Sequence, residues 1–143
     1  MTEPAVGALL RAVQKRAVEA GAPWGSRAYV SIAPEGTAYP YLIYQVQGGG
    51  ERNAIRARDA EIVLVIQVFD DSLAGALGGS TVIEQRFNDQ GLYDTTTPVD
   101  GGAAWAILTS TQERAVFLTN QVDGQLVYQS GAFFRFRMES LPV

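Results

Sequence analysis

The chain of 143 residues has no cysteine, no histidine and a single lysine, Lys15. These absences exclude disulfide bonds, cysteine and imidazole nucleophiles, the serine–histidine dyad and the commonest zinc ligands. Histidine is also the usual proton shuttle near neutral pH, so most familiar enzyme chemistries are excluded with it. Lys15 falls on the polar side of a helical pattern, and we do not expect it to act as a nucleophile.

Net positive charge and long apolar runs are also missing. Eleven Lys and Arg against fifteen Asp and Glu give a net charge of −4, the opposite of the basic surface typical of nucleic-acid binders. No apolar run approaches the roughly 20 residues of a membrane-spanning helix, and the first four residues carry no targeting signal. We therefore expect no membrane partner, no sequence-specific nucleic acid, and a protein that starts in the cytoplasm.

The residues present are those of one soluble domain with a hydrophobic core. Hydrophobic residues make up 47% of the chain, which suits a single domain over residues 1–143. Every cation except Lys15 is an arginine. Arginine is enriched at protein interfaces, so this bias favours protein contacts, although genome composition explains it equally well.

Apolar periodicity predicts two helices, at residues 4–20 and 73–90. The first has one apolar stripe and ends before Gly21. Asp70 and Asp71 are interpreted as the cap and first-turn charges of the second. Three glycines inside the second helix each cost about 0.5 to 1 kcal/mol relative to alanine, which close packing on a sheet would explain.

Extended segments are predicted between and after the helices, with residues 60–69 at the centre of the sheet because both of their faces are apolar. Asp123-Gly124 is a hairpin signal. The other predicted strands cover residues 27–32, 39–47, 103–110, 114–122, 125–128 and 132–139. The fold class is therefore α+β, with a mixed or antiparallel β-sheet and two helices packed on it.

Two arginine-rich regions are candidate protein interfaces. Residues 48–59 have no strand or helix period, contain a glycine triplet, and read as a long flexible loop. Strand alternation places the arginines of the last strand on one face, where they need anions from neighbouring copies or partners. A solvated loop and sheet face are the alternative. The candidate interface residues are Arg52, Arg56, Arg58, Arg135 and Arg137.

Catalytic, metal and cofactor sites are poorly supported, and we predict none of them. Three carboxylate pairs could serve as acid–base or metal sites: Asp70 with Asp71, Asp59 with Glu61, and Glu84 with Asp89. Residues 75–80 are glycine-rich but lack the order of a phosphate-binding loop. An apolar pocket is the remaining possibility, and four aromatic residues could line it: Tyr39, Tyr41, Tyr44 and Trp105.

The order of these elements resembles the tail-terminator, or tail-completion, proteins of long-tailed bacteriophages. The resemblance rests on the strand Pro40-Tyr41-Leu42-Ile43-Tyr44 and on its spacing to the helix segment Ile83-Glu84-Gln85-Arg86-Phe87-Asn88. It covers most of the chain and departs most after Asp94, where β structure continues for longer.

The resemblance implies a structural virion protein without catalytic residues or cofactors. Such a protein forms a ring, typically a hexamer, at the head-proximal end of the tail tube, ends tube polymerisation and offers the surface for head–tail joining. Its partners are further copies of itself, the major tail tube protein and the neck or head-completion proteins, with DNA able to pass through the ring lumen. The alternatives are a neck or head-completion protein and, from another class, a small-ligand-binding or enzymatic α+β domain.

Overall fold

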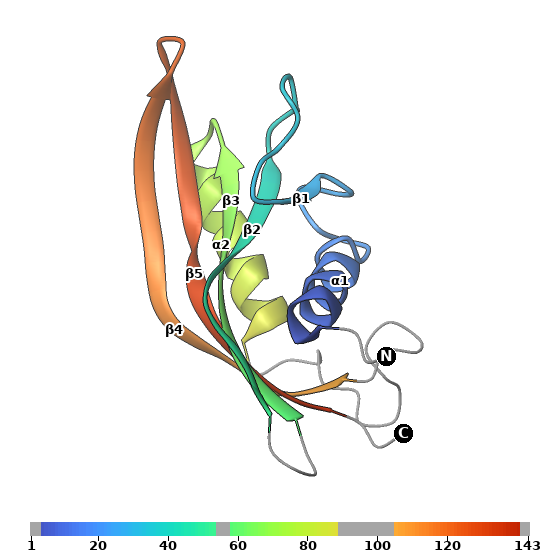
Figure 1. Ribbon diagram of the computed structural model, residues 1–143. Helices are drawn as coiled ribbons and strands as arrows, with labels where there is room; N and C mark the ends of the chain where they lie inside the picture. Colours follow the sequence, from blue (N-terminus) through green and yellow to red (C-terminus); the bar gives the residue numbers. More distant parts are fainter. Residues whose placement is uncertain (1–3, 54–57, 89–104, 141–143) are drawn as a thin grey trace.

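A five-stranded sheet carries two helices on one face (Figure 1). The computed structural model describes residues 4–53, 58–88 and 105–140. In chain order the elements are α1 (Ala5–Ala17), β1 (Ala28–Val30), β2 (Tyr41–Asn53), β3 (Arg58–Asp70), α2 (Leu73–Phe87), β4 (Trp105–Val122) and β5 (Gln125–Ser140).

The strand order is β1-β2-β3-β5-β4, so β3 lies in the middle, as the apolar pattern predicted. β1 runs parallel to β2, and all the other neighbours are antiparallel, so the sheet is mixed. The central place of β3 follows from its composition, because Leu64 and Ile66 on one face and Val65 on the other are all buried.

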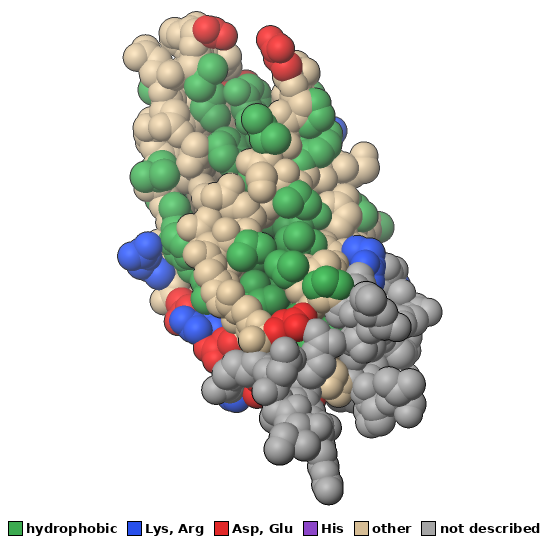
Figure 2. Space-filling view, viewed as in Figure 1, with side chains coloured by type: hydrophobic (Ala, Val, Ile, Leu, Met, Phe, Trp, Pro, Cys, Tyr) green, Lys and Arg blue, Asp and Glu red, His purple; other side chains and the backbone are tan. Residues whose placement is uncertain are grey.

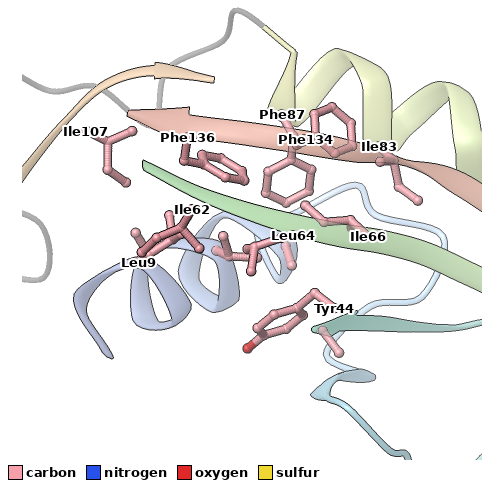
Figure 3. Packing of buried hydrophobic residues seen from close by; sticks show 14 of the residues in the cluster. Leu9, Tyr44, Ile62, Leu64, Ile66, Ile83, Phe87, Ile107, Phe134 and Phe136 are labelled. Carbon is pink, nitrogen blue, oxygen red and sulfur yellow. The ribbon is translucent and has the colours of Figure 1, made fainter. Parts of the chain in front are cut away.

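Both helices pack on the same face of the sheet and close a single core. Figure 3 shows Leu9 of α1 beside Ile62 and Leu64, and Phe87 of α2 against Phe134 of β5. The rings of Phe87 and Phe134 have centroids 6.1 Å apart. This arrangement confirms the α+β class with two helices on one sheet and a single compact domain.

The expectation of an irregular loop over residues 48–59 is wrong for all of its described residues. Residues 48–53 belong to β2 and pair with residues 58–63 of β3, while residues 54–57 lie outside the described part. The sequence does not indicate this strand because glycine has no side chain, so the three glycines show no alternation of apolar and polar residues. At Gly49, with φ +97°, a Cβ would lie 2.0 Å from the Glu61 carbonyl oxygen, so the close approach of the strands requires glycine.

Where the sequence predicts four C-terminal strands, the structure has two long ones. β4 spans residues 105–122 with irregularities after Ile107 and Gln112, and β5 spans residues 125–140 without interruption. A Cβ at Gly131 would lie 1.9 Å from the Ile66 carbonyl oxygen, so this glycine lets β5 approach β3 rather than ending a strand. The Asp123-Gly124 turn is confirmed, with φ of +50° and +79°.

The helix boundaries also differ from the predicted ones. α1 ends at Ala17 and α2 at Phe87. Asp70 is the last residue of β3, and Ser72 is the N-cap of α2, so the assignment of Asp70 and Asp71 as cap and first-turn charges is wrong. Ser72 takes the capping position because its hydroxyl accepts a hydrogen bond from the Gly75 amide in the first turn of α2, at 3.2 Å.

Candidate protein interface

The face of the sheet opposite the helices is apolar along its middle. Strand alternation places Ile43, Val65, Phe69 and Phe133 there, on the sides of their strands that face away from α1 and α2. Figure 2, in the view where α2 lies behind the strands, shows hydrophobic side chains along the middle of the molecule and charged ones toward its lower left. We call this side of the sheet the open face. Ile43 and Val65 on it are buried and Phe69 and Phe133 are half-buried, so it offers only a limited apolar surface to a partner.

The charged part of the open face is centred on Arg135. Its guanidinium pairs with the carboxylate of Glu61 on β3 and, at 3.1 Å, with that of Glu113 on β4. The hydrogen bonds that the guanidinium donates, to Glu113 first and to Glu61 second, raise the pKa of Arg135 above its ordinary value. The expectation that its anions come from neighbouring copies is therefore wrong, because two carboxylates of its own sheet supply them.

Arg137, two residues along β5, has a different environment. Its side chain is exposed, and its backbone pairs with Glu61 on one side and Thr109 on the other. Among the described residues it forms no ion pair with a carboxylate. Arg137 therefore stays available to a partner in a way that Arg135 does not.

The mid-chain arginines are placed at one end of the sheet. Arg52 lies on β2 opposite Asp59, and Arg58 lies on β3 opposite Asn53. Asp59 is in turn opposite Glu139 of β5, so the backbones of Arg52 and Arg137 approach the same end of the sheet. Arg56 lies outside the described residues. The five candidate arginines therefore include one already paired within the chain.

A groove opens beside the top of β2. It has a volume of about 350 Å³ and is lined by the segment 31–37 together with Tyr39, Tyr41, Ile43 and Phe69. Tyr39, Tyr41 and Phe69 form a stack with centroid separations of 5.5 and 5.1 Å. Burial first, and the neighbouring Tyr39 second, raise the pKa of Tyr41. Glu35 is the only acidic residue among the lining residues.

The predicted aromatic set does not form one pocket. Only Tyr39 and Tyr41 line the groove, whereas Tyr44 and Trp105 are buried in the core. The Tyr44 hydroxyl donates to Gln14 Oε1 at 2.6 Å, and burial raises the pKa of Tyr44 to about 12. Residues an odd number of positions apart on one strand point to opposite faces of the sheet, which is why Tyr41 and Tyr44, three residues apart on β2, lie on different sides.

The carboxylate pairs have structural environments. Asp70 is buried at the end of β3, where its Oδ1 accepts the Ser72 amide at 3.2 Å, and Asp71 accepts a hydrogen bond from the side chain of Gln125. Glu61 is the ion-pair partner of Arg135, and Asp89 lies outside the described residues. Within the described ranges, no group of three or more acidic residues could hold a metal ion.

The β4–β5 hairpin follows from the Asp123-Gly124 turn predicted above, but the sequence analysis does not identify its exposed apolar side chains as a candidate surface. β3 ends at Asp70, opposite Tyr128, and the hairpin continues alone to its turn at residues 123–124 (Figure 1). It exposes about half of each of four large apolar side chains: Phe117 48%, Leu118 50%, Val122 49% and Leu126 50%. The uncharged stretch 115–122, without proline, is the signal that could have identified this surface.

Comparison with known proteins finds a similar fold among solved structures. No protein-family model matches the chain, and no curated protein sequence matches it. A solved structure of the virion of a native gene transfer agent (GTA) particle contains a chain with the same fold. The TM-score is 0.66 at 18% identity, and the match covers 95% of this chain and 98% of that one. Neither α1 nor α2, the helices of the described residues, is long and apolar enough to cross a membrane.

Proposed function

We propose that this chain is a structural protein of a phage-like virion and that it ends the tail tube. Copies of it form a ring, a hexamer, at the head-proximal end of the tube. One side of the ring covers the last ring of tube subunits, and the other side is the joining surface for neck or head-completion proteins. No bond is made or broken, and DNA passes through the lumen.

The observation that carries the proposal is the match to a virion chain over almost the whole length of both proteins. Fold similarity alone does not assign a function, so the surfaces must support the role as well. The exposed apolar side chains of the hairpin, and Arg137, which is exposed and has no carboxylate partner among the described residues, are surfaces suited to protein partners. The order of sequence elements adds the specific resemblance to tail terminators.

The mechanism requires only matched surfaces. A ring of identical copies uses two different patches on each copy, and the interface closes on itself when the rotation between neighbours divides a full turn. Capping then follows if one face of the ring resembles a tube ring and the opposite face does not, because no further tube ring can bind there. Arg52, Arg56, Arg58 and Arg137 are our candidates for contacts with carboxylates of neighbouring copies or of the tube.

Imaging of purified tails tests the proposal directly. Particles assembled with a tagged copy of the chain should carry label at one tail end only, and their tails should have one length. Tails assembled without the chain should be longer and variable. Label at the head-proximal end without any change of tail length would favour a neck protein instead. Label along the tube, or on no part of the particle, would contradict both assignments.

A further inference from the structure

The two edge strands of the sheet, β1 and β4, contain residues that lie in the same rows across the sheet. Following the register across the sheet from Tyr29 of β1 leads to Ile43, Gln67 and Gly131, and then to Val116 of β4. The rows on either side lead in the same way from Ala28 to Phe117 and from Val30 to Ala115. No register shift falls within these three rows, so the correspondence between the edges is unambiguous.

The outward backbone groups of the two edges are complementary. In β1, the Arg27 carbonyl accepts the Leu42 amide at 2.8 Å and the Ser31 amide donates to Tyr44, so odd-numbered residues face β2 and Ala28 and Val30 face outward. The Ala28 amide and the Val30 carbonyl already bond within turns, to Ser26 and Ile32. This leaves the Ala28 carbonyl and the Val30 amide for a neighbouring strand.

Along each strand, successive residues bond alternately to the strand on one side and to the strand on the other. Following this alternation from β1 across the sheet shows which residues of β4 bond to β5 and which point outward. Val116 faces β5, and therefore Ala115 and Phe117 direct their amides and carbonyls away from the sheet. The direction of the strands alternates from β2 to β4, so β4 runs opposite to β1. A β1 edge placed against a β4 edge at this level is therefore an antiparallel pair.

The side chains at this level suit a joint between proteins. None of the six residues 28–30 and 115–117 is charged. Val30 is 45% exposed and Phe117 48% exposed, and both lie on the helix side of their strands. In the matched register Phe117 faces Ala28 and lies diagonal to Val30, within reach of side-chain contact. Edge strands that must stay single usually carry lysine, proline or charge, and residues 115–122 have none.

We propose that neighbouring copies of this chain join through these edges, with β4 of one copy adding antiparallel to β1 of the next. Tyr29 then faces Val116 of the next copy. The Phe117 amide donates to the Ala28 carbonyl, and the Val30 amide donates to the Ala115 carbonyl. The contact is heterologous, as a closed ring requires, and it leaves the open face and the hairpin tip for other partners. The inference rests on the proposed function and names the joint of its ring.

The absence of native cysteine makes disulfide trapping a clean test. Residues facing each other in a pair without direct hydrogen bonds have Cβ atoms close enough for a disulfide. The full chain carrying both Tyr29→Cys and Val116→Cys should give a ladder of covalent oligomers after mild oxidation, read on a non-reducing gel. Each single variant alone should stay monomeric on that gel, and co-expression of the two single variants should give covalent dimers.

The matched control is the double variant that carries Tyr29→Cys and Leu118→Cys. Leu118 is on the same face of β4 as Val116 but two residues out of register, too far for a disulfide without movement of the strands. A second comparison uses Phe117→Pro, which removes the outward amide while leaving the β4–β5 ladder intact, and Phe117→Ala, which keeps the amide. Circular dichroism reports the fold, and light scattering reports the assembly, which only the proline variant should lose completely.

The outcomes distinguish a failure of the proposed β1–β4 contact from a failure of the proposed role in tail termination. If the chain forms rings and ends tails but the double variant gives no cross-links, the joint is wrong and the proposed function remains. If Val116→Cys alone cross-links, a two-fold β4–β4 contact replaces the joint, and the inference is overturned. If the ladder forms but tails grow normally without the chain, the joint is supported and the role in tail termination fails.

Discussion

At the scale of single residues, Arg86 of α2 links the two helices. Its guanidinium donates to four carbonyls at the end of α1 and just beyond: Arg16 at 3.1 Å, Ala17 at 3.3 Å, Glu19 at 3.0 Å and Ala20 at 3.0 Å. Trp24 also donates to the Ala17 carbonyl, at 2.7 Å. The last carbonyls of a helix lack amide partners four residues on, and a cation near them is favoured by the helix dipole. The Arg16 carbonyl also accepts the Glu19 amide at 3.4 Å.

Replacement of Arg86 by lysine should lower the free energy of unfolding by about 2 kcal/mol, because hydrogen bonds to charged groups contribute about 1.5 to 3 kcal/mol. Lysine keeps the charge but lacks the planar group that reaches several carbonyls at once. Urea denaturation of the parent, Arg86→Lys and Arg86→Ala measures the loss. Equal stability of the parent and Arg86→Lys would mean that charge alone, and not the hydrogen-bond geometry, holds the end of α1.

Asp70 should make the stability of the fold depend on pH. Burial raises the pKa of Asp70 above its ordinary value of 3.8, although the Ser72 amide opposes this. The folded state then binds the Asp70 proton more tightly than the unfolded state, so this contribution to stability is complete below pH 3.8 and is lost as pH rises through the folded pKa. Asp70→Asn stays neutral and should therefore gain stability relative to the parent as pH rises.

Denaturation of Asp70→Asn and the parent between about pH 3 and pH 7 tests this sign. The difference in free energy of unfolding should favour the variant more at the upper end. Asp123→Asn, at the exposed hairpin turn where φ is +50°, is the control for the removal of one carboxylate. A difference between Asp70→Asn and the parent that does not change with pH would show that burial does not govern the Asp70 carboxyl.

At the scale of elements, the three glycines of α2 lie in different surroundings, so glycine is required at some of these positions and not at others. A Cβ at Gly79 would lie 2.8 Å from Val68 Cγ1, and one at Gly75 would lie 2.1 Å from Asp70 Oδ2. A Cβ at Gly78 would meet nothing within 4 Å. Two of the three glycines therefore let α2 approach β3, as their presence in a helix suggested, and the third only weakens the helix.

Alanine at these positions should have opposite effects. Gly78→Ala should stabilise the protein by about 0.5 to 1 kcal/mol, because the helix gains propensity at an open position. Gly79→Ala should destabilise it by about 1 to 3 kcal/mol, because the added methyl group overpacks the contact with Val68. Thermal denaturation of the two variants beside the parent decides this. A stabilising Gly79→Ala would show that α2 does not pack tightly on β3.

At the scale of the whole molecule, the two arginines of β5 divide between stability and assembly. Arg135 holds Glu61 and Glu113 together across three strands, whereas Arg137 is exposed with no carboxylate partner in the described part of the chain. A double charge reversal would therefore mix two effects, and the single reversals separate them.

Arg137→Glu should keep the stability of the parent and weaken ring formation or tail termination. Arg135→Glu should instead lower stability, because it places a third carboxylate beside Glu61 and Glu113. Denaturation and light scattering of both variants, followed by imaging of tails, measure the two effects. If Arg137→Glu assembles and ends tails like the parent, this side of the sheet faces only solvent and the interface must lie elsewhere.

The sequence by itself determined the α+β class, the two helices and the central place of β3, because hydrophobic periodicity and length are local properties of the chain. It also determined the hairpin turn at Asp123-Gly124, whose backbone conformation those residue types favour. It failed at residues 48–53 and at Gly131, where glycine marks close strands rather than a loop, since only the neighbouring backbone reveals that reason.

The tertiary structure alone decided which charges are free and which edges match. Glu61, Glu113 and Arg135 are far apart in sequence and meet only because β3, β5 and β4 are neighbours, so alternation within one strand could not show that Arg135 is already neutralised. In the same way, the correspondence of Tyr29 with Val116 is a sum of four strand registers. Each register is set by packing between strands, and none of them is encoded by a local pattern.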